Sequence, residues 1–161
     1  MSQDITDFQG SDIIDVRDVI ARVEELRSER DSLKEQCDDC VSAYEYHDGD
    51  DTKSTPEYDD MLKAKADLTE WENDNSEELT ELEELLSSMC GYGGDEQWEG
   101  DWYPVTLIHE NYFESAMDEL LEDVGDTPKD LPSYLTITVD YDVLKQDYSE
   151  VEFNGDTYYY R

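Results

Sequence analysis

Residues 13–44 read IIDVRDVIARVEELRSERDSLKEQCDDCVSAY, a stretch without Pro or Gly in which mainly apolar side chains recur at alternating steps of three and four. This spacing is typical of the a and d positions of a coiled-coil helix, sustained here over about four heptads with one break at Arg30. The repeating positions are Val16, Val19, Val23, Leu26, Leu33, Cys37, Cys40 and Tyr44. The stretch therefore predicts an amphipathic helix roughly 48 Å long at ~1.5 Å per residue.

A second stripe of the same kind runs from about Glu57 to Met89, after a loop-like segment at residues 47–56 that is rich in Asp, Thr and Ser and ends in Pro. Asn75 is polar within this stripe. The apolar positions are Met61, Ala64, Leu68, Trp71, Leu82, Leu85 and Met89, widened by Leu79 and Leu86. Two such helices joined by a short loop predict an antiparallel helical hairpin over residues 11–90, in which the two stripes pack on each other. The alternative is that the two stripes form a groove that binds a helix of a partner protein.

The rest of the chain predicts a mostly α, α+β protein. We expect a flexible leader at residues 1–10, a Gly/Trp-rich acidic linker at 91–104 and a small α+β domain at 105–161. Within that domain the expected elements are a strand or helix entry at Val105–Ile108, a helix at 111–124, a strand at Leu135–Val139, a short helix at 140–148 with an Asp cap, and a β-hairpin around Asn154-Gly155. Residues expected inside the 111–124 helix are Tyr112, Phe113, Ala116, Leu120, Leu121 and Val124.

Charge is the strongest compositional feature. The chain of 161 residues has 46 Asp+Glu against 11 Lys+Arg, which gives a formal net charge of −35. Nucleic acids, anionic membranes and phosphorylated substrates all require clustered Lys or Arg, so the composition argues against each of them as a direct ligand. The apolar runs are too short to cross a membrane, and three cysteines fit a reducing compartment. We therefore expect a protein of a reducing cytoplasm that binds a basic partner.

The acids are concentrated between Lys65 and Lys129, a stretch that holds 20 Asp+Glu and no Lys or Arg. Like charges four residues apart, such as Glu70 and Asp74, destabilise a helix by a few tenths of a kcal/mol each. A surface kept only for solubility needs far less charge, so a functional negative surface is the favoured interpretation and a solvated surface the alternative. The predicted partner-binding acids are Asp67, Glu70, Glu72, Asp74, Glu77, Glu78, Glu81, Glu83, Glu84, Asp95, Glu96, Glu99, Asp101, Glu114, Asp118, Glu119, Glu122 and Asp123.

The spacing of these acids suggests a comparison with DNA. Duplex DNA presents one negative charge per ~1.7 Å of its axis. A helix that rises ~1.5 Å per residue and carries an acid at every second or third position approaches that density. The hairpin is therefore predicted to present carboxylates where a DNA-binding protein expects phosphates.

Other chemistry is weakly supported. Cys37 and Cys40 have a C-x-x-C spacing but fall in the helical stripe, which favours packing over a zinc site completed by Cys90, His47 or His109. The acidic loop of residues 48–51 lacks the glycine of an EF-hand, since Lys53 takes that position. Nucleophile-elbow, P-loop and zinc-protease motifs are missing from the sequence. We expect no catalytic residues, no metal and no cofactor.

The C-terminal third, roughly residues 105–161, resembles the ArdA-type antirestriction proteins of phages and plasmids. NYFESAMDELLEDVG at 111–125 resembles the helix pattern YFxxYAxxLAxDxG of that group. DYDVLKQDY at 140–148 and VEFNGDTYYYR at 151–161 resemble its ending, DWEAAAxxLxxDY…VxFDGVTYWxR. The resemblance implies an acidic DNA mimic that occupies the DNA channel of a restriction enzyme.

The leading hypothesis is thus a non-enzymatic antirestriction protein of a phage or mobile element. It would block the DNA-binding groove of a host defence protein, either a restriction-modification enzyme or a CRISPR effector. One alternative is a helical assembly protein that pairs through its coiled-coil seam, and another is an acidic chaperone for basic DNA-binding proteins. The sequence is also compatible with a homodimer.

Overall fold

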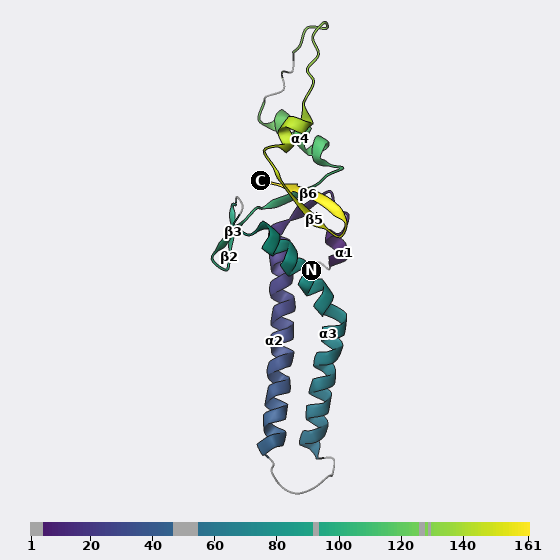
Figure 1. Cartoon of the computed structure of the whole chain (residues 1–161), viewed down its shortest axis with the longest axis vertical. Helices are drawn as coiled ribbons and strands as arrows, with labels where there is room; N and C mark the ends of the chain where they lie inside the picture. Colours follow the sequence, from purple (N-terminus) through teal and green to yellow (C-terminus); the bar gives the residue numbers. More distant parts are fainter. Residues whose placement is uncertain (1–4, 47–54, 92–93, 126–127, 129) are drawn as a thin grey trace. The chain divides into compact units, whose positions relative to one another are not determined.

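The structure of the chain is a computed structural model that describes residues 5–46, 55–91, 94–125, 128 and 130–161 (Figure 1). Two compact units are present, one formed by residues 21–83 and the other by residues 1–20 together with 84–161. The predicted fold class is confirmed: two long helices pack against each other, and a small antiparallel sheet domain with a C-terminal β-hairpin follows.

The two long helices are α2 (Val16–Tyr46) and α3 (Pro56–Met89), close to the predicted ranges. Side-chain contacts join them within residues 21–83. Arg22 pairs with Glu78, Glu29 accepts a hydrogen bond from Trp71, and the Tyr44 and Tyr58 rings lie 5.5 Å apart. Because the partners advance in opposite directions along the two helices, the pairing is antiparallel, as the short loop requires.

The helical stripes form the core of this unit. Within residues 21–83 the buried apolar side chains come from both stripes: Val23, Leu26, Cys37, Met61, Ala64, Leu79 and Leu82. Leu33, Cys40, Leu68 and Trp71 are half-buried. Tyr44, predicted in the seam, is 41% exposed. The seam is therefore tightest around Val23 and Leu82 and looser in its middle part, where Leu68 and Trp71 are only half-buried.

The second unit is built on a four-stranded antiparallel sheet of order β1-β4-β6-β5. Its strands are β1 (Ile13–Asp15), β4 (Thr106–His109), β5 (Ser149–Phe153) and β6 (Asp156–Tyr160). The prediction for Val105–Ile108 is a strand or the entry into a helix, and the strand is what forms. The β5–β6 hairpin turns at Asn154 and Gly155, which both have positive φ (52° and 84°), as this dipeptide predicts.

The N-terminal residues differ from the prediction. The short helix α1 (Ile5–Phe8) lies in the segment expected to be a flexible leader, and the Phe8 side chain is buried. Ile14, expected inside the first long helix, pairs with Leu107 of β4 instead, so α2 begins at Val16. The edge of the sheet offers Ile13–Asp15 backbone hydrogen bonds and a buried site for Ile14, and these outweigh one further helical turn.

The segment expected to be a linker contains a two-stranded sheet of β2 (Glu96–Trp98) and β3 (Asp101–Tyr103). Glu99 and Gly100 form the turn, both with positive φ. Gly94 packs against β3 so closely that a Cβ there would lie 2.8 Å from the Tyr103 carbonyl oxygen, which explains the glycine.

Two helices cover the sheet, α4 (Phe113–Asp123) and the short α5 (Tyr141–Lys145). Phe113, Met117 and Tyr159 form a buried cluster against which residues of both helices pack. Asp140 caps α5 as predicted, since its carboxylate accepts a hydrogen bond from the Val143 amide.

Two expectations for this domain are wrong. Leu120 and Val124, predicted to lie inside, are 44% and 59% exposed, because the buried face of α4 is set by Phe113 and Met117. Residues 135–139, predicted to form a strand, adopt no regular secondary structure. Among the helices in the described part of the chain, none is long and apolar enough to cross a membrane.

Candidate functional site: the acidic surface

The predicted partner-binding acids are divided between the two units. Eight belong to the 21–83 unit, namely Asp67, Glu70, Glu72, Asp74, Glu77, Glu78, Glu81 and Glu83. The other ten belong to the sheet unit, namely Glu84, Asp95, Glu96, Glu99, Asp101, Glu114, Asp118, Glu119, Glu122 and Asp123. The acids therefore form a separate surface on each unit.

Five acids of α3 recur at steps of three and four residues, which places them along one face of the helix. They are Asp67, Glu70, Asp74, Glu77 and Glu81, and we call them the α3 acidic stripe. The three central members are exposed and the two terminal ones half-buried. Within the described residues, no Lys or Arg forms an ion pair with any of the five. The stripe is therefore a row of carboxylates open to a partner.

The charge density of the stripe is comparable to that of one DNA strand. Its members are separated by 14 steps along the helix, about 21 Å at ~1.5 Å per residue, so neighbouring members are roughly 5 Å apart along the axis. A DNA strand has one phosphate per ~3.4 Å. The intervals are shorter than the Debye length of about 8 Å at physiological salt, so a partner experiences the charges together.

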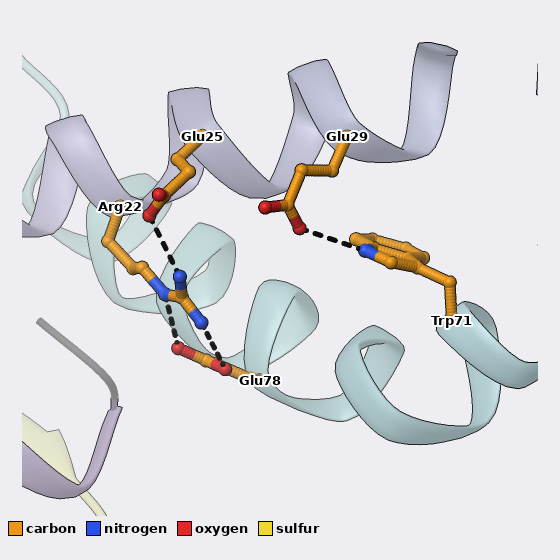
Figure 2. A network of polar contacts seen from close by, with 5 residues as sticks. All are labelled: Arg22, Glu25, Glu29, Trp71 and Glu78. Carbon is orange, nitrogen blue, oxygen red and sulfur yellow. Dashed lines mark hydrogen bonds and ion pairs between the residues drawn. The ribbon is translucent and has the colours of Figure 1, made fainter. Parts of the chain in front are cut away.

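Glu78 has a different role from the stripe. Arg22 of α2 donates two hydrogen bonds to its carboxylate, from Nε at 2.8 Å and from Nη2 at 3.1 Å, and a third from Nη1 to Glu25 at 2.8 Å (Figure 2). The Arg22 and Glu78 side chains are only 10% and 12% exposed. The bond to Glu78 raises the pKa of the Arg22 guanidinium. Although predicted as a partner-binding acid, Glu78 has its charge compensated inside the hairpin.

Glu83 is engaged in a similar way. The Arg27 guanidinium donates a hydrogen bond to its carboxylate at 2.7 Å, although both side chains remain about one-third exposed. The sequence shows the arginines of α2 but not their partners, because the partners depend on the register of the two helices. Arg22 and Arg27 thus pair with acids of α3 that point toward α2, and among the described residues neither pairs with a member of the α3 acidic stripe.

Trp71 adds a further polar contact between the helices. Its indole Nε1–H donates to Glu29 at 3.0 Å, and Figure 2 shows this bond beside the Arg22 network. Trp71, predicted as a seam residue, is half-buried. A tryptophan at this position buries apolar surface while it satisfies its one donor at the rim of the seam.

The acids of α4 form the second surface. Glu114, Asp118 and Glu122 recur at steps of four and are exposed, as are Glu119 and Asp123. Asp118 accepts a hydrogen bond of 2.6 Å from the Tyr141 hydroxyl, which fastens α5 to α4. The same bond raises the pKa of Tyr141. Five exposed acidic side chains therefore lie on α4.

The remaining predicted acids lie near the small sheet. Asp95, Glu99 and Asp101 are exposed, Glu96 is half-buried in β2, and Glu84 is exposed near the end of α3. Close by, burial raises the pKa of Tyr103 to about 12, with a further contribution from its hydrogen bond to Cys90. Tyr103, which is buried, is therefore a packing residue of this region.

The cysteines and histidines that could hold zinc lie mainly in packed parts of the structure. Cys37 is buried in the seam and Cys40 half-buried, and both are free thiols. No group of three His, Cys, Asp or Glu side chains arranged to hold a metal occurs in the described part of the chain. His109 is buried, its Nδ1 accepts the Asn111 amide hydrogen at 3.1 Å, and its ring packs on Tyr158. His47 and the acidic loop of residues 48–51 lie outside the described residues.

Comparison of this chain with protein-family models, with curated proteins and with solved structures finds no match. The likeness of residues 105–161 to the ArdA-type pattern therefore stays a prediction.

Proposed function

We propose that this protein is a non-enzymatic DNA mimic of a phage or mobile element, which inhibits a host defence protein by occupying its basic DNA-binding groove. The observation that carries the proposal is the α3 acidic stripe, a row of uncompensated carboxylates on one face of a long helix. A groove that binds DNA is lined with Lys and Arg at the spacing of phosphates. Such a groove would exchange its counterions for these carboxylates.

The binding is collective. Each exposed charge contributes little by itself, in the range of about 0.2–1 kcal/mol for an exposed ion pair. Several charges within one Debye length of each other act together, and the resulting affinity falls steeply as salt increases. Single neutralisations should therefore have small effects and multiple neutralisations large ones.

The coiled-coil assembly alternative has less support. The seam residues of α2 and α3, including Leu26 and Leu82, are buried against each other within the chain. Pairing with another chain through the same seam would require the hairpin to open. The acidic-chaperone alternative differs in selectivity, since a chaperone binds many basic proteins and an inhibitor selects one.

The test is a capture experiment from bacterial lysate at low salt, followed by elution with short duplex DNA. We expect one DNA-binding defence protein to be retained and then released by the duplex. The stripe variant carries Glu70→Gln, Asp74→Asn, Glu77→Gln and Glu81→Gln. The control variant removes the same number of charges from exposed positions of α2, with Glu35→Gln, Asp38→Asn, Asp39→Asn and Glu45→Gln.

The stripe variant should lose the captured protein and the control variant should retain it. Retention of a protein that DNA does not displace would contradict mimicry. Equal loss in the two variants would show that net charge, and not the stripe, determines binding.

A further inference from the structure

The segment of residues 130–139 is the most exposed apolar part of the sheet unit. It reads DLPSYLTITV and contains no charged residue after Asp130, in a chain where acids are otherwise frequent. Every side chain from Asp130 to Thr138 is exposed, with Tyr134 at 83% and Leu135 at 52%. Figure 1 shows the segment as a loop without a strand arrow that extends beyond α4. We call residues 134–139 the arm.

The arm has the sequence of a strand and lacks a strand partner. Four of its six residues, from Thr136 to Val139, are β-branched, and apolar and Thr side chains alternate. In the described part of residues 128–139, the backbone hydrogen bond present is the turn bond from the Leu135 amide to the Pro132 carbonyl. An unpaired apolar strand is a template for pairing with another sheet edge.

The root of the arm lies in an acidic hollow. Thr138 and Val139 line a hollow of about 280 Å³ together with Glu114 of α4 and Asp140, Tyr141 and Asp142 of α5. Three acidic residues therefore line one space at the point where the arm joins the domain. The Tyr141–Asp118 hydrogen bond holds α5 against α4 and so fixes the shape of the hollow.

The basic residue of α5 does not compensate these carboxylates. The Lys145 ammonium lies over the rings of Phe113 and Tyr159, at 5.7 Å and 5.6 Å from their centroids. The hollow thus combines the apolar arm on one side with acidic residues on the other, and among the described residues no Lys or Arg forms an ion pair with those acids. The complementary ligand is a strand with a Lys or Arg at its end.

We propose that the arm adds as a strand to an exposed sheet edge of a partner protein, with a Lys or Arg beside that edge placed in the hollow of Glu114, Asp140 and Asp142. Main-chain pairing would supply affinity, and the hollow would supply direction and selectivity. A second copy of this chain is the poorer occupant, because its arm carries no base and each copy brings a net charge of −35.

The probe is a short fluorescent peptide in which Val and Thr alternate and which ends in two Lys, titrated with the full chain at physiological salt. Ile137→Pro removes one backbone donor from the arm, whereas Ile137→Thr keeps both the donor and the β-branch. Both variants retain the charge of the parent chain, so the nonspecific electrostatic attraction of the basic peptide is the same in all three proteins. We expect Ile137→Pro to weaken binding about tenfold or more and Ile137→Thr by less than about threefold. Hydrogen exchange at residues 134–139 should slow on binding in the parent chain.

A charge test examines the hollow separately. Glu114→Gln with Asp142→Asn should weaken the peptide about tenfold, whereas Glu35→Gln with Asp38→Asn, which removes as much charge from α2, should change binding less than about twofold. Binding that is equally strong in the Ile137→Pro variant would overturn the proposal. Dimerisation of the parent chain that Ile137→Pro abolishes in sedimentation would also overturn it, because the occupant would then be a second copy. The stripe variant should bind the peptide normally, so failure here is distinguishable from failure of DNA mimicry.

Discussion

The helices α2 and α3 share a seam and differ in their outward faces. Both are longer than 30 residues and contribute fully buried aliphatic side chains to the same core. Yet α2 has nine acids and five bases, whereas α3 has twelve acids and two bases. Folding of the hairpin requires the buried seam, but it is compatible with an outward face of mixed charge, as in α2, or of mostly negative charge, as in α3. The excess charge of α3 is therefore a property that folding does not explain, and our proposal assigns it to partner binding.

The largest expected effect concerns the buried seam that α2 and α3 share. Leu26 of α2 and Leu82 of α3 are both fully buried. Leu26→Ala and Leu82→Ala should each lower the free energy of unfolding by about 2–5 kcal/mol, from lost burial plus the cavity left behind. Chemical denaturation measures both values. A cost below about 1 kcal/mol at either site would mean that the seam is not the core of the hairpin.

The next effect concerns the polar contact between the helices. Arg22→Met should destabilise the hairpin by about 2–3 kcal/mol, because the mostly buried Glu78 carboxylate would lose its partner. Lys34→Met, at an exposed base of the same helix, should change stability by less than about 0.5 kcal/mol. The double variant Arg22→Met with Glu78→Met should recover much of the loss. Similar values for the Arg22 and Lys34 variants would show that the Arg22 bonds do not contribute.

A smaller effect distinguishes the starts of the two helices. At α2, Asp15 accepts the Arg17 amide hydrogen and pairs with its guanidinium, and that bond lowers the pKa of Asp15. A lowered pKa stabilises the fold above the ordinary value near 3.8, and this contribution is lost as pH falls through the folded-state pKa. At α3, Thr55 supplies a neutral cap to the Tyr58 amide.

Asp15→Asn should therefore cost stability at neutral pH and flatten the acid limb of the stability curve, whereas Thr55→Ala should cost about 1 kcal/mol or less at all pH values. Thermal unfolding between pH 2 and 7 measures both. An unchanged acid limb in Asp15→Asn would contradict the role given to Asp15.

The smallest expected effect concerns the outward face of α3, which is more acidic than that of α2. Glu77→Gln removes a like-charge contact with Glu81 and should stabilise α3 by a few tenths of a kcal/mol at low salt. The gain should disappear at high salt, where the repulsion is screened. Thermal unfolding at two salt concentrations measures it. A loss of stability at low salt would mean that the stripe contributes to folding.

Much of the helical architecture is predictable because it depends on local spacing. The three-and-four repeat gives both helices, Pro56 marks the start of α3, and Asn154-Gly155 gives the hairpin turn. The strand at Ile13–Asp15 is not predictable in this way, because three residues are too short to show alternation and their partner lies far along the chain. The β2–β3 pair does have a local signal, the Glu99-Gly100 turn between aromatic residues, but its strands are equally short.

The acidic surface is predictable only in part. Composition identifies the base-free stretch and spacing identifies the acids of α3, but which of them remain uncompensated depends on the helix register that brings Arg22 to Glu78. The exposure of Tyr134 and Leu135 is likewise a tertiary property, since a strand sequence does not reveal whether the chain supplies a partner.

The most direct test of the central claim is a competition experiment with the protein captured from lysate. Its binding to fluorescent duplex DNA would be measured against increasing amounts of the parent chain, the stripe variant and the α2 control variant. We predict that the parent chain and the control displace the duplex at similar concentrations, and that the stripe variant requires at least about tenfold more, equivalent to about 1.4 kcal/mol. Equal displacement by all three would contradict the claim that the α3 acidic stripe replaces the phosphates of DNA.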